Sequence, residues 1–286
     1  GHGSRMKSTT PKVLHKIGHR PMLHHVMALG KALGAGRQVV VVGAGGEQVA
    51  EAARSFDADT AIALQDPPQG TGHAVQMALP ALEGFSGKVI ILYADVPMLG
   101  VKSAKDLVNA TDEADLGVLG FETDNPGAYG RLLQTADGNL DRIVEYKDAN
   151  EEERAITLCN AGLMAVSADV LRKHLPQLSN DNAQGEYYLT DLPAMVRKEG
   201  GGCAIVRAEI EETSGVNNRA ELAAAENIFQ QRARQAAMLD GVTLRDPSSV
   251  YFAYDTVIAN DVTIAQNVVF GPGVVVEAGA RIEAFS

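Results

Sequence analysis

The last part of the chain repeats every six residues, a period that neither an α-helix nor an ordinary β-strand produces. Two apolar series follow it: Ile258, Ile264, Phe270, Val276 and Ile282, and Val262, Val268, Val274 and Ala280. Helices repeat every 3.6 residues and strands every two. A period of six therefore indicates a solenoid built from short strands and corners.

These hexads resemble the hexapeptide left-handed parallel β-helix, in which three hexads close one triangular coil. Five hexads make fewer than two coils, whereas a solenoid needs about three repeats to bury a continuous core. We therefore expect residues 247–286 to be the truncated beginning of such a domain, without a complete acyltransferase site. This beginning should dock on the preceding helix or on another copy of the chain.

The first two hundred residues show apolar strands that alternate with helices. Strands are expected at 38–42, 61–64, 88–93, 116–121, 130–133, 140–146, 157–166 and 203–208, and helices at 21–33, 46–55, 72–82, 167–175 and 187–199. Such alternation is typical of βαβ units, and continuous β-branched runs are typical of strands covered on both faces. The sequence predicts a Rossmann-like α/β fold whose mixed, mainly parallel sheet has helices on both faces.

A long helix is expected between these two patterns, over residues 219–239. Leu222, Ala225, Phe229, Ala233 and Ala236 share one stripe of it, and at about 1.5 Å per residue it spans roughly 30 Å. We therefore divide the chain into an α/β domain at 1–215, a linking helical arm at 216–246 and the beginning of the β-helix at 247–286.

Composition excludes several classes of function. The net charge of −11 argues against a nucleic-acid partner, because phosphate backbones require a basic face. No apolar run approaches the roughly 20 residues of a membrane helix, and no secretory signal is visible. Cys159 and Cys203 have no neighbouring metal-ligand pattern, so both are expected to be reduced and buried. The chain is predicted to be cytoplasmic, with no membrane partner.

The opening residues, Gly1-His2-Gly3-Ser4-Arg5-Met6-Lys7, combine two glycines with clustered cations, and Lys12 follows shortly afterwards. Glycines let backbone N–H groups approach an anion, and cations neutralise a polyphosphate. The same start is also typical of a vector-derived leader. Taken alone, the pattern suggests a nucleotide-binding loop only modestly.

Three motifs follow one another along the chain: the opening loop with Pro11-Lys12-Val13-Leu14, Tyr93-Ala94-Asp95-Val96-Pro97, and Gly215-Val216-Asn217-Asn218. Their order resembles the sugar-1-phosphate nucleotidyltransferases, in particular the bacterial N-acetylglucosamine-1-phosphate uridylyltransferases. The family motif begins with a strand ending Leu-Ala-Ala-Gly, of which only Gly1 is present here. Ala94 replaces the usual glycine and is expected to crowd the backbone slightly.

The resemblance implies roles at the phosphates and the metal. Arg5 and Lys12 would be the catalytic cations, with Gly1 and Gly3 in the nucleotide-binding loop. Asp95 and Asn217 would hold Mg²⁺, which takes its remaining oxygens from phosphates and water, and Asn218 would cap the long helix. From spacing alone, Asp95 is equally compatible with a simple turn cap, and the cations with ordinary surface charges.

The resemblance also implies two pockets. Gln65, Gly70, Thr71, Tyr93 and Ala94 would bind the nucleotide, and Gln65 offers a donor and an acceptor to a pyrimidine edge. The sugar would contact a second set, Gly130, Glu145, Asn160, Thr190 and Asn217. A helix start at Thr71 and a polar loop before residue 190 are the purely structural alternatives.

The implied reaction joins UTP and N-acetylglucosamine 1-phosphate into UDP-N-acetylglucosamine and pyrophosphate, for peptidoglycan and lipopolysaccharide precursors. A longer parent would also acetylate glucosamine 1-phosphate and form a homotrimer through its β-helix. Two alternatives stay open at this point. One is a transferase for another sugar 1-phosphate, and the other is a non-catalytic assembly subunit with the same two domains.

Overall fold

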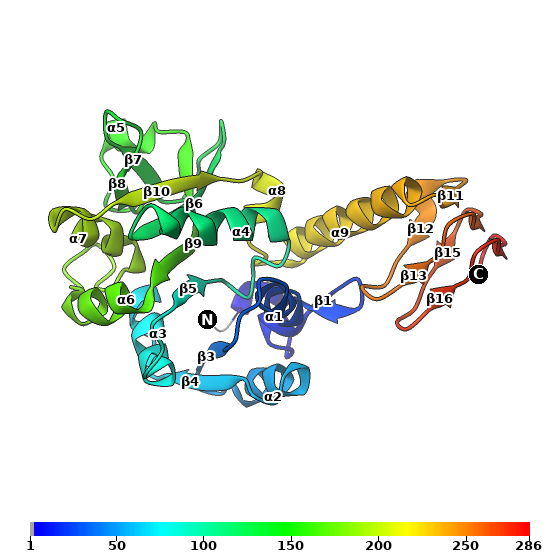
Figure 1. Cartoon of the computed structure of the whole chain (residues 1–286), viewed down its shortest axis with the longest axis horizontal. Coiled ribbons are helices and arrows are strands. Elements are labelled where there is room, and N and C mark those ends of the chain that lie inside the picture. The colour runs from blue at the N-terminus through cyan, green and yellow to red at the C-terminus, as the bar shows by residue number, and fades with distance from the viewer. Residues whose placement is uncertain (1–2) are drawn as a thin grey trace. The chain divides into compact units, whose positions relative to one another are not determined.

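A computed structural model describes residues 3–286, which form two compact units. Unit 1 comprises Val26–Ser214. Unit 2 comprises residues 3–25 together with Gly215–Ser286. The boundary falls inside α1 (Met22–Ala32), and Figure 1 shows the course of the chain. The first residues of the chain thus group with its last seventy or so.

Unit 1 contains the predicted alternation of strands and helices. Its strands are β3 (Val39–Gly43), β4 (Ala61–Gln65), β5 (Lys88–Ile91), β6 (Leu116–Glu122), β7 (Arg131–Gln134), β8 (Leu140–Val144), β9 (Leu158–Ser167) and β10 (Cys203–Arg207). Its helices after α1 are α2 (Glu47–Phe56), α3 (Thr71–Ala78), α4 (Val101–Asn109), α5 (Glu151–Arg154), α6 (Ala168–His174), α7 (Leu192–Lys198) and α8 (Ile210–Thr213). Helix α4 was not expected from the sequence.

The main sheet of unit 1 is built around β9. Strand β6 pairs along one edge of β9, and β5 and β7 pair with it on the other, all antiparallel. Strand β10 pairs parallel to β6, and β8 antiparallel to β7. It follows that β5, β6, β7 and β10 point one way and β8 and β9 the other. The sheet is mixed, as predicted, but it is not mainly parallel in its pairing, because among its described strands only β10 and β6 pair in parallel. Strands β3 and β4 form a separate parallel pair.

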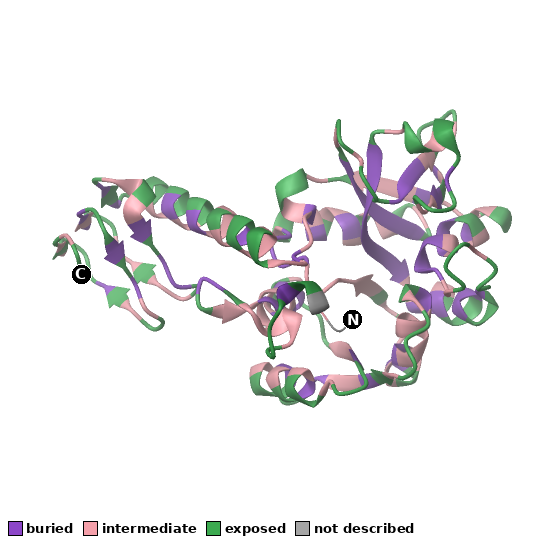
Figure 2. Ribbon diagram, turned by 180° about the vertical axis from the view of Figure 1, so that it is seen from behind, coloured by how far each residue is buried: buried purple, intermediate pink, exposed green. Residues whose placement is uncertain are grey.

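Helices cover both faces of this sheet, because the side chains of β9 alternate between two cores. Leu158, Met164 and Val166 join a cluster with Leu171 of α6 and Val196 of α7. Cys159, Leu163 and Ala165 of β9 join a second cluster with Leu107 of α4. Figure 2 shows the strands at the centre of the sheet as buried. Both cysteines are free and buried, as expected.

Unit 2 contains the hexad coils. After the β1 (Lys16–Ile17) and β2 (Arg20–Pro21) hairpin and α9 (Arg219–Leu239), its strands are β11 (Thr243–Leu244), β12 (Val250–Tyr251), β13 (Val257–Ile258), β14 (Thr263–Ile264), β15 (Val268–Val269), β16 (Val275–Val276) and β17 (Arg281–Ile282). Val250 pairs with Val268 and Val257 with Val275, both in parallel. A step of 18 residues is three hexads, which confirms the predicted coil.

The coils dock on α9, as expected, but through polar side chains as well as apolar ones. Ala233 and Ala237 pack against the coil core. The buried Gln230 accepts from Phe252 N and donates to Phe252 O, both at 2.8 Å, and the buried Arg234 donates to Val250 O at 2.8 Å. The predicted apolar stripe was wrong at Ala236, which is exposed.

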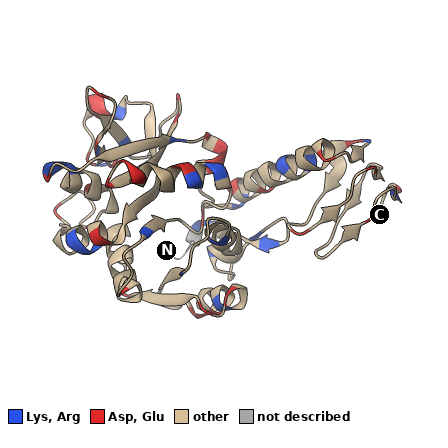
Figure 3. Cartoon of the chain, viewed as in Figure 1, with Lys and Arg blue, Asp and Glu red and all other residues tan. Residues whose placement is uncertain are grey.

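Among residues 3–286, no helix is both long and apolar enough to cross a lipid bilayer. Acidic and basic residues are interspersed along α4 and α9 (Figure 3), so neither helix presents a continuous basic stripe.

Replacing Gln230 should loosen the first coil. Gln230→Ala leaves the buried N–H and C=O of Phe252 without partners, which should lower the free energy of unfolding by about 2–3 kcal/mol. Gln231→Ala, at the exposed neighbouring position of the same helix, is the matched control and should change it by less than about 0.5 kcal/mol. Urea denaturation measures both, and equal effects would contradict the docking role.

Candidate functional site

The turn between β4 and α3 holds the side chain of Gln65 in a fixed orientation. Gln65 ends β4, and its Nε2 donates to the carbonyl oxygen of Gly70 at 2.8 Å. Gly70 has φ of +106°, and a Cβ there would lie 2.6 Å from Tyr187 O. Only glycine therefore suits this position.

The same turn is hydrogen-bonded to the segment 187–189. Tyr187 N donates to Gln69 O at 2.8 Å, and Gly72 N donates to Tyr187 O at 2.8 Å. Leu189 N donates to the hydroxyl oxygen of Thr71 at 3.1 Å. We call residues 69–72 the base loop. Within unit 1 it is hydrogen-bonded to the segment that leads to Thr190, a member of the predicted sugar set.

Glu145 and Thr190, from the predicted sugar set, are in direct contact. The Thr190 hydroxyl donates to Glu145 Oε1 at 3.0 Å. Burial raises the pKa of the Glu145 carboxyl, the Thr190 hydrogen bond opposes this, and the charges of Asp148 and Glu186 raise it further. Burial likewise raises the pKa of Asp191, with Asp148 and Glu145 adding to the effect.

Gly130 and Asn160 lie side by side on neighbouring strand ends. Asn160 N donates to Gly130 O at 2.9 Å, and the buried Asn160 side chain accepts from Gly162 N at 2.9 Å. The pairing of β6 with β9 shifts register between Val118 and Gly120, opposite this stretch. Such irregularities redirect side chains, here around Asn160 and Gly162.

Tyr93 and Asp95 follow β5, at the carboxyl end of a strand where open α/β sheets bind ligands. Val96 N donates to Tyr93 O at 3.0 Å, which closes a turn over Ala94 and Asp95. Burial raises the pKa of the Tyr93 phenol, the negative charges of Glu145 and Asp95 raise it further, and a hydrogen bond with Thr71 lowers it. The pKa of Tyr93 is therefore affected by Thr71 of the predicted nucleotide set, Glu145 of the sugar set and Asp95 of the metal pair.

Unit 2 holds the predicted phosphate loop and Asn217. Lys12 Nζ donates to Asn217 Oδ1 at 3.1 Å. A Cβ at Gly3 would lie 2.8 Å from Lys12 Cβ, so the loop passes close to this lysine. Arg5 is exposed, and Gly1 lies outside the described residues. That this group meets Asp95 at one active site stays a prediction.

The first turn of α9 anchors that loop. Asn218 caps the helix by accepting from Ala220 N and Glu221 N, both at 2.9 Å, as expected. Glu221 in turn accepts from Asn217 N at 2.6 Å, and Arg219 Nε donates to Met6 O at 3.2 Å. These bonds position Asn217 for the Lys12 contact.

The donor atoms of Asp95 and Asn217 fit a hard cation such as Mg²⁺. Both supply oxygen, and Asn217 Oδ1 retains acceptor capacity beside Lys12 because a carbonyl oxygen has two lone pairs. No three His, Cys, Asp or Glu residues are grouped for metal binding in the described part of the chain. Each residue therefore offers a donor atom of the kind that such an ion prefers, and that the two bind one ion stays a prediction.

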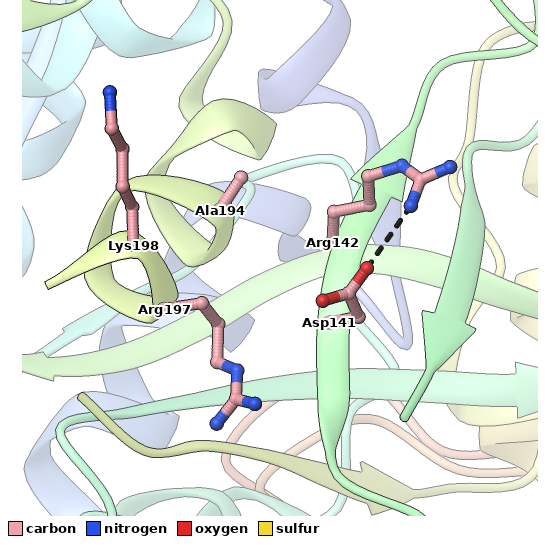
Figure 4. Close-up of a pocket in the computed structure, with 5 residues that line it drawn as sticks. All are labelled: Asp141, Arg142, Ala194, Arg197 and Lys198. Atoms are coloured by element: carbon pink, nitrogen blue, oxygen red, sulfur yellow. Dashed lines mark hydrogen bonds and ion pairs between the residues drawn. The ribbon is translucent and has the colours of Figure 1, made fainter. Parts of the chain in front are cut away.

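A hollow between β8 and α7 is a separate feature. It is lined by Asp141, Arg142, Ala194, Arg197 and Lys198 and encloses about 360 Å³. Arg142 pairs with Asp141 at 3.1 Å, and Lys198 points away from the other cations in Figure 4. None of its residues belongs to the predicted sets, and its cations do not converge.

Sequence reasoning assigned no contact to two residues that bond to the base loop, residues 69–72, or to Gln65 before it. Tyr187 supplies backbone bonds to the loop, although a helix was expected from residue 187 onward. His73 lies with its Nδ1 3.3 Å from Gln65 Nε2. His73 stands within the Gly70-Thr71-Gly72-His73 run, but only the fold reveals its contact with Gln65.

The mixed sheet of unit 1, with helices on both faces, has a nucleotidyltransferase fold. The chain belongs to the family of the MobA-like NTP transferase domain, which matches residues 1–186.

Its similar relatives include two named "Bifunctional protein GlmU". That of Paracoccus denitrificans (strain Pd 1222) is 52% identical over 258 residues, covering 90% of this chain and 57% of the relative. That of Cereibacter sphaeroides (strain ATCC 17025 / ATH 2.4.3) is 50% identical over 285 residues, covering 100% and 63%. The chain thus spans about three-fifths of these relatives.

Solved structures support the fold. An apo UDP-glucose pyrophosphorylase aligns with a TM-score of 0.64 at 15% identity, covering 82% of this chain and 96% of that one. A nucleoside-diphosphate-sugar pyrophosphorylase from Vibrio cholerae RC9 aligns with a TM-score of 0.63 at 14% identity, covering 79% and 97%. At these identities the likeness concerns the fold alone.

Gly162→Ala should displace Tyr93. A Cβ at Gly162 would lie 2.5 Å from Tyr93 Cε2, whereas Gly138 has the same φ of +82° and nothing within 4 Å. Both substitutions bear the cost of a left-handed backbone, so their difference isolates the clash. We expect Gly162→Ala to be less stable than Gly138→Ala by about 1–3 kcal/mol in chemical denaturation. Similar values would mean that Tyr93 is free to move.

Glu145→Gln should remove a pH-dependent loss of stability. The folded Glu145 carboxyl holds its proton more tightly than the unfolded one, whose pKa is near 4.5. The free energy of unfolding of the unsubstituted protein therefore falls as pH rises from 4.5 through the raised pKa, while Glu145→Gln lacks this component. Thr190→Val should steepen the fall, because the opposing hydrogen bond is lost. Denaturation curves across this range measure the slopes, and parallel slopes for all three proteins would contradict the assignment.

Proposed function

We propose that the chain catalyses the formation of UDP-N-acetylglucosamine and pyrophosphate from UTP and N-acetylglucosamine 1-phosphate. The observation that carries the proposal is the bonded junction between the base loop at 69–72 and the segment 187–190, whose Thr190 contacts Glu145. Base and sugar segments that share one framework suit an enzyme that joins a nucleotide to a sugar. The similarity to GlmU proteins supports the same choice.

The chemistry requires alignment and charge neutralisation more than proton transfer. An oxygen of the sugar 1-phosphate attacks the α-phosphorus of UTP and forms the new P–O bond. The bond from that phosphorus to the oxygen bridging the β-phosphate breaks, and pyrophosphate leaves with the electron pair. The attacking phosphate is already ionised, so positioning and electrostatics carry the catalysis.

Each predicted residue has a defined task. Arg5 and Lys12 neutralise the triphosphate, and Gly1 and Gly3 let the loop backbone approach it. Asp95 and Asn217 would hold Mg²⁺, which supplies charge neutralisation at the phosphates when bound. Gly70, Thr71, Tyr93 and Ala94 line the base and ribose side.

Glu145 and Thr190 form a joined acceptor and hydroxyl pair for the sugar, with Asn160 and Gly130 beside them. Their existing contact, at 3.0 Å, holds the carboxylate in place before the sugar arrives. Such preorganisation lowers the entropy cost of binding.

The wider setting is also proposed. Residues 1–215 would form the uridylyltransferase domain, 216–246 the arm, and 247–286 the beginning of an acetyltransferase β-helix. The whole protein would be a cytoplasmic homotrimer that also acetylates glucosamine 1-phosphate. It would supply cell-envelope precursors without contacting nucleic acid or membrane.

Pyrophosphate release tests the proposal. With Mg²⁺ and UTP, N-acetylglucosamine 1-phosphate should be turned over faster than glucose 1-phosphate. Asp95→Asn should lower the rate by roughly 10²–10³-fold, because the charge that holds the metal is lost. Asp106→Asn, on α4 and paired with Lys102, is the control and should leave the rate unchanged. Equal rates for Asp95→Asn and the unsubstituted protein would refute the metal role, and a preference for glucose 1-phosphate would refute the substrate.

A further inference from the structure

The hydrogen bonds of Gln65 define which end of its amide is available to a ligand. Gly70 O can only accept a hydrogen bond, so the group that faces it at 2.8 Å must be the amide nitrogen, Nε2. One of the two Nε2 protons is used in this bond. This contact already opposes rotation of the amide by half a turn.

His73 engages the second proton. Its Nδ1 lies 3.3 Å from the same Nε2. Because Nε2 is a donor, Nδ1 must be the unprotonated ring nitrogen, and the ring proton is carried on the other side. With both protons engaged, Gln65 has no donor left for a ligand.

The ring of His73 is itself held in place. His73 lies in the first turn of α3, and its ring centroid is 6.3 Å from that of Tyr187, at an interplanar angle of 44°. Tyr187 is in turn bonded through its backbone to Gln69 and Gly72. His73 Nδ1, the acceptor that faces Gln65, is therefore held in place by a ring contact with Tyr187, which is itself bonded to the turn.

Only Oε1 of Gln65 remains, and it has no hydrogen-bond partner among the described residues. We propose that His73 is a positioning residue that locks Gln65 as a hydrogen-bond acceptor, and that this lock selects uracil over cytosine nucleotides. Uracil presents an N–H at ring position 3, which suits an acceptor. Cytosine in the same pose presents a lone pair there and would oppose Oε1. The inference rests on the proposed function, in which Gln65 faces the base.

The sequence led us to expect that Gln65 offers a ligand both a donor and an acceptor, whereas these contacts leave only the acceptor. A freely rotating glutamine amide could turn its nitrogen to cytosine and accept either base. A locked amide discriminates, since a wrong base leaves a polar group of the site unpaired. Removing the lock should therefore affect selectivity more than overall binding.

A matched pair of variants separates the hydrogen bond from the packing. His73→Phe keeps a ring against Tyr187 but removes the acceptor, whereas His73→Asn removes the ring but keeps a side-chain oxygen that can accept from Nε2. The ratio of kcat/KM for UTP to that for CTP, with N-acetylglucosamine 1-phosphate and Mg²⁺, is the readout. We expect His73→Phe to lower this ratio by about fivefold to tenfold and His73→Asn to retain most of it.

Equilibrium binding of UTP and CTP to the same proteins gives the ratio without turnover. If the unsubstituted protein binds UTP selectively but transfers nothing, the proposed function fails while the inference is still tested by binding. An unchanged ratio in His73→Phe, an equal loss in His73→Asn, or no selectivity in the unsubstituted protein overturns the inference. If His73→Phe does not fold, His73→Leu replaces it with the same expectation.

Discussion

The pairing of β9 with its three neighbours is the interaction on which unit 1 depends. This strand is buried along nine of its ten residues and contributes alternate side chains to the clusters on both faces of the sheet. Its antiparallel partners on either edge bring β5 and β7 to one side and β6 to the other. The end of β5 and the start of β7 therefore lie along the same edge of β9, which brings Tyr93 next to Gly162 and Gly130 next to Asn160.

Electrostatics impose the second constraint. A chain of net charge −11 that handles phosphates must place its cations locally. In unit 2 the Lys12 ammonium is held by Asn217, and the capped start of α9 holds Asn217. In unit 1 partial burial raises the pKa of the Glu145 carboxyl, and the charges of Asp148 and Glu186 raise it further. The carboxylates of unit 1 would suit sugar hydroxyls, which donate hydrogen bonds and carry no charge.

Much of the fold could be predicted because local patterns dictate it. The hexads predicted coils of 18 residues, since a period of six has few structural solutions, and the Asn217-Asn218 pair marked the start of α9. The helix expected from residue 187 begins only at Leu192. The backbone groups of Tyr187 and Leu189 are hydrogen-bonded to the base loop instead of to a helix. Helix α4 was also not predicted. The burial of Gln230 and Arg234 was not predicted because the sequence does not show which backbone groups a polar side chain will bond.

The sequence by itself determined the family, the order of the motifs and the residue types that suit phosphate, metal, base and sugar. These follow from local pattern and from chemistry that each side chain carries alone. The tertiary structure decided which of those groups contact one another: that Gln65 Nε2 donates to Gly70 O, that Thr190 donates to Glu145, and that Lys12 donates to Asn217. Such contacts join residues up to 205 positions apart, and only the packing of strands and helices brings partners that distant together.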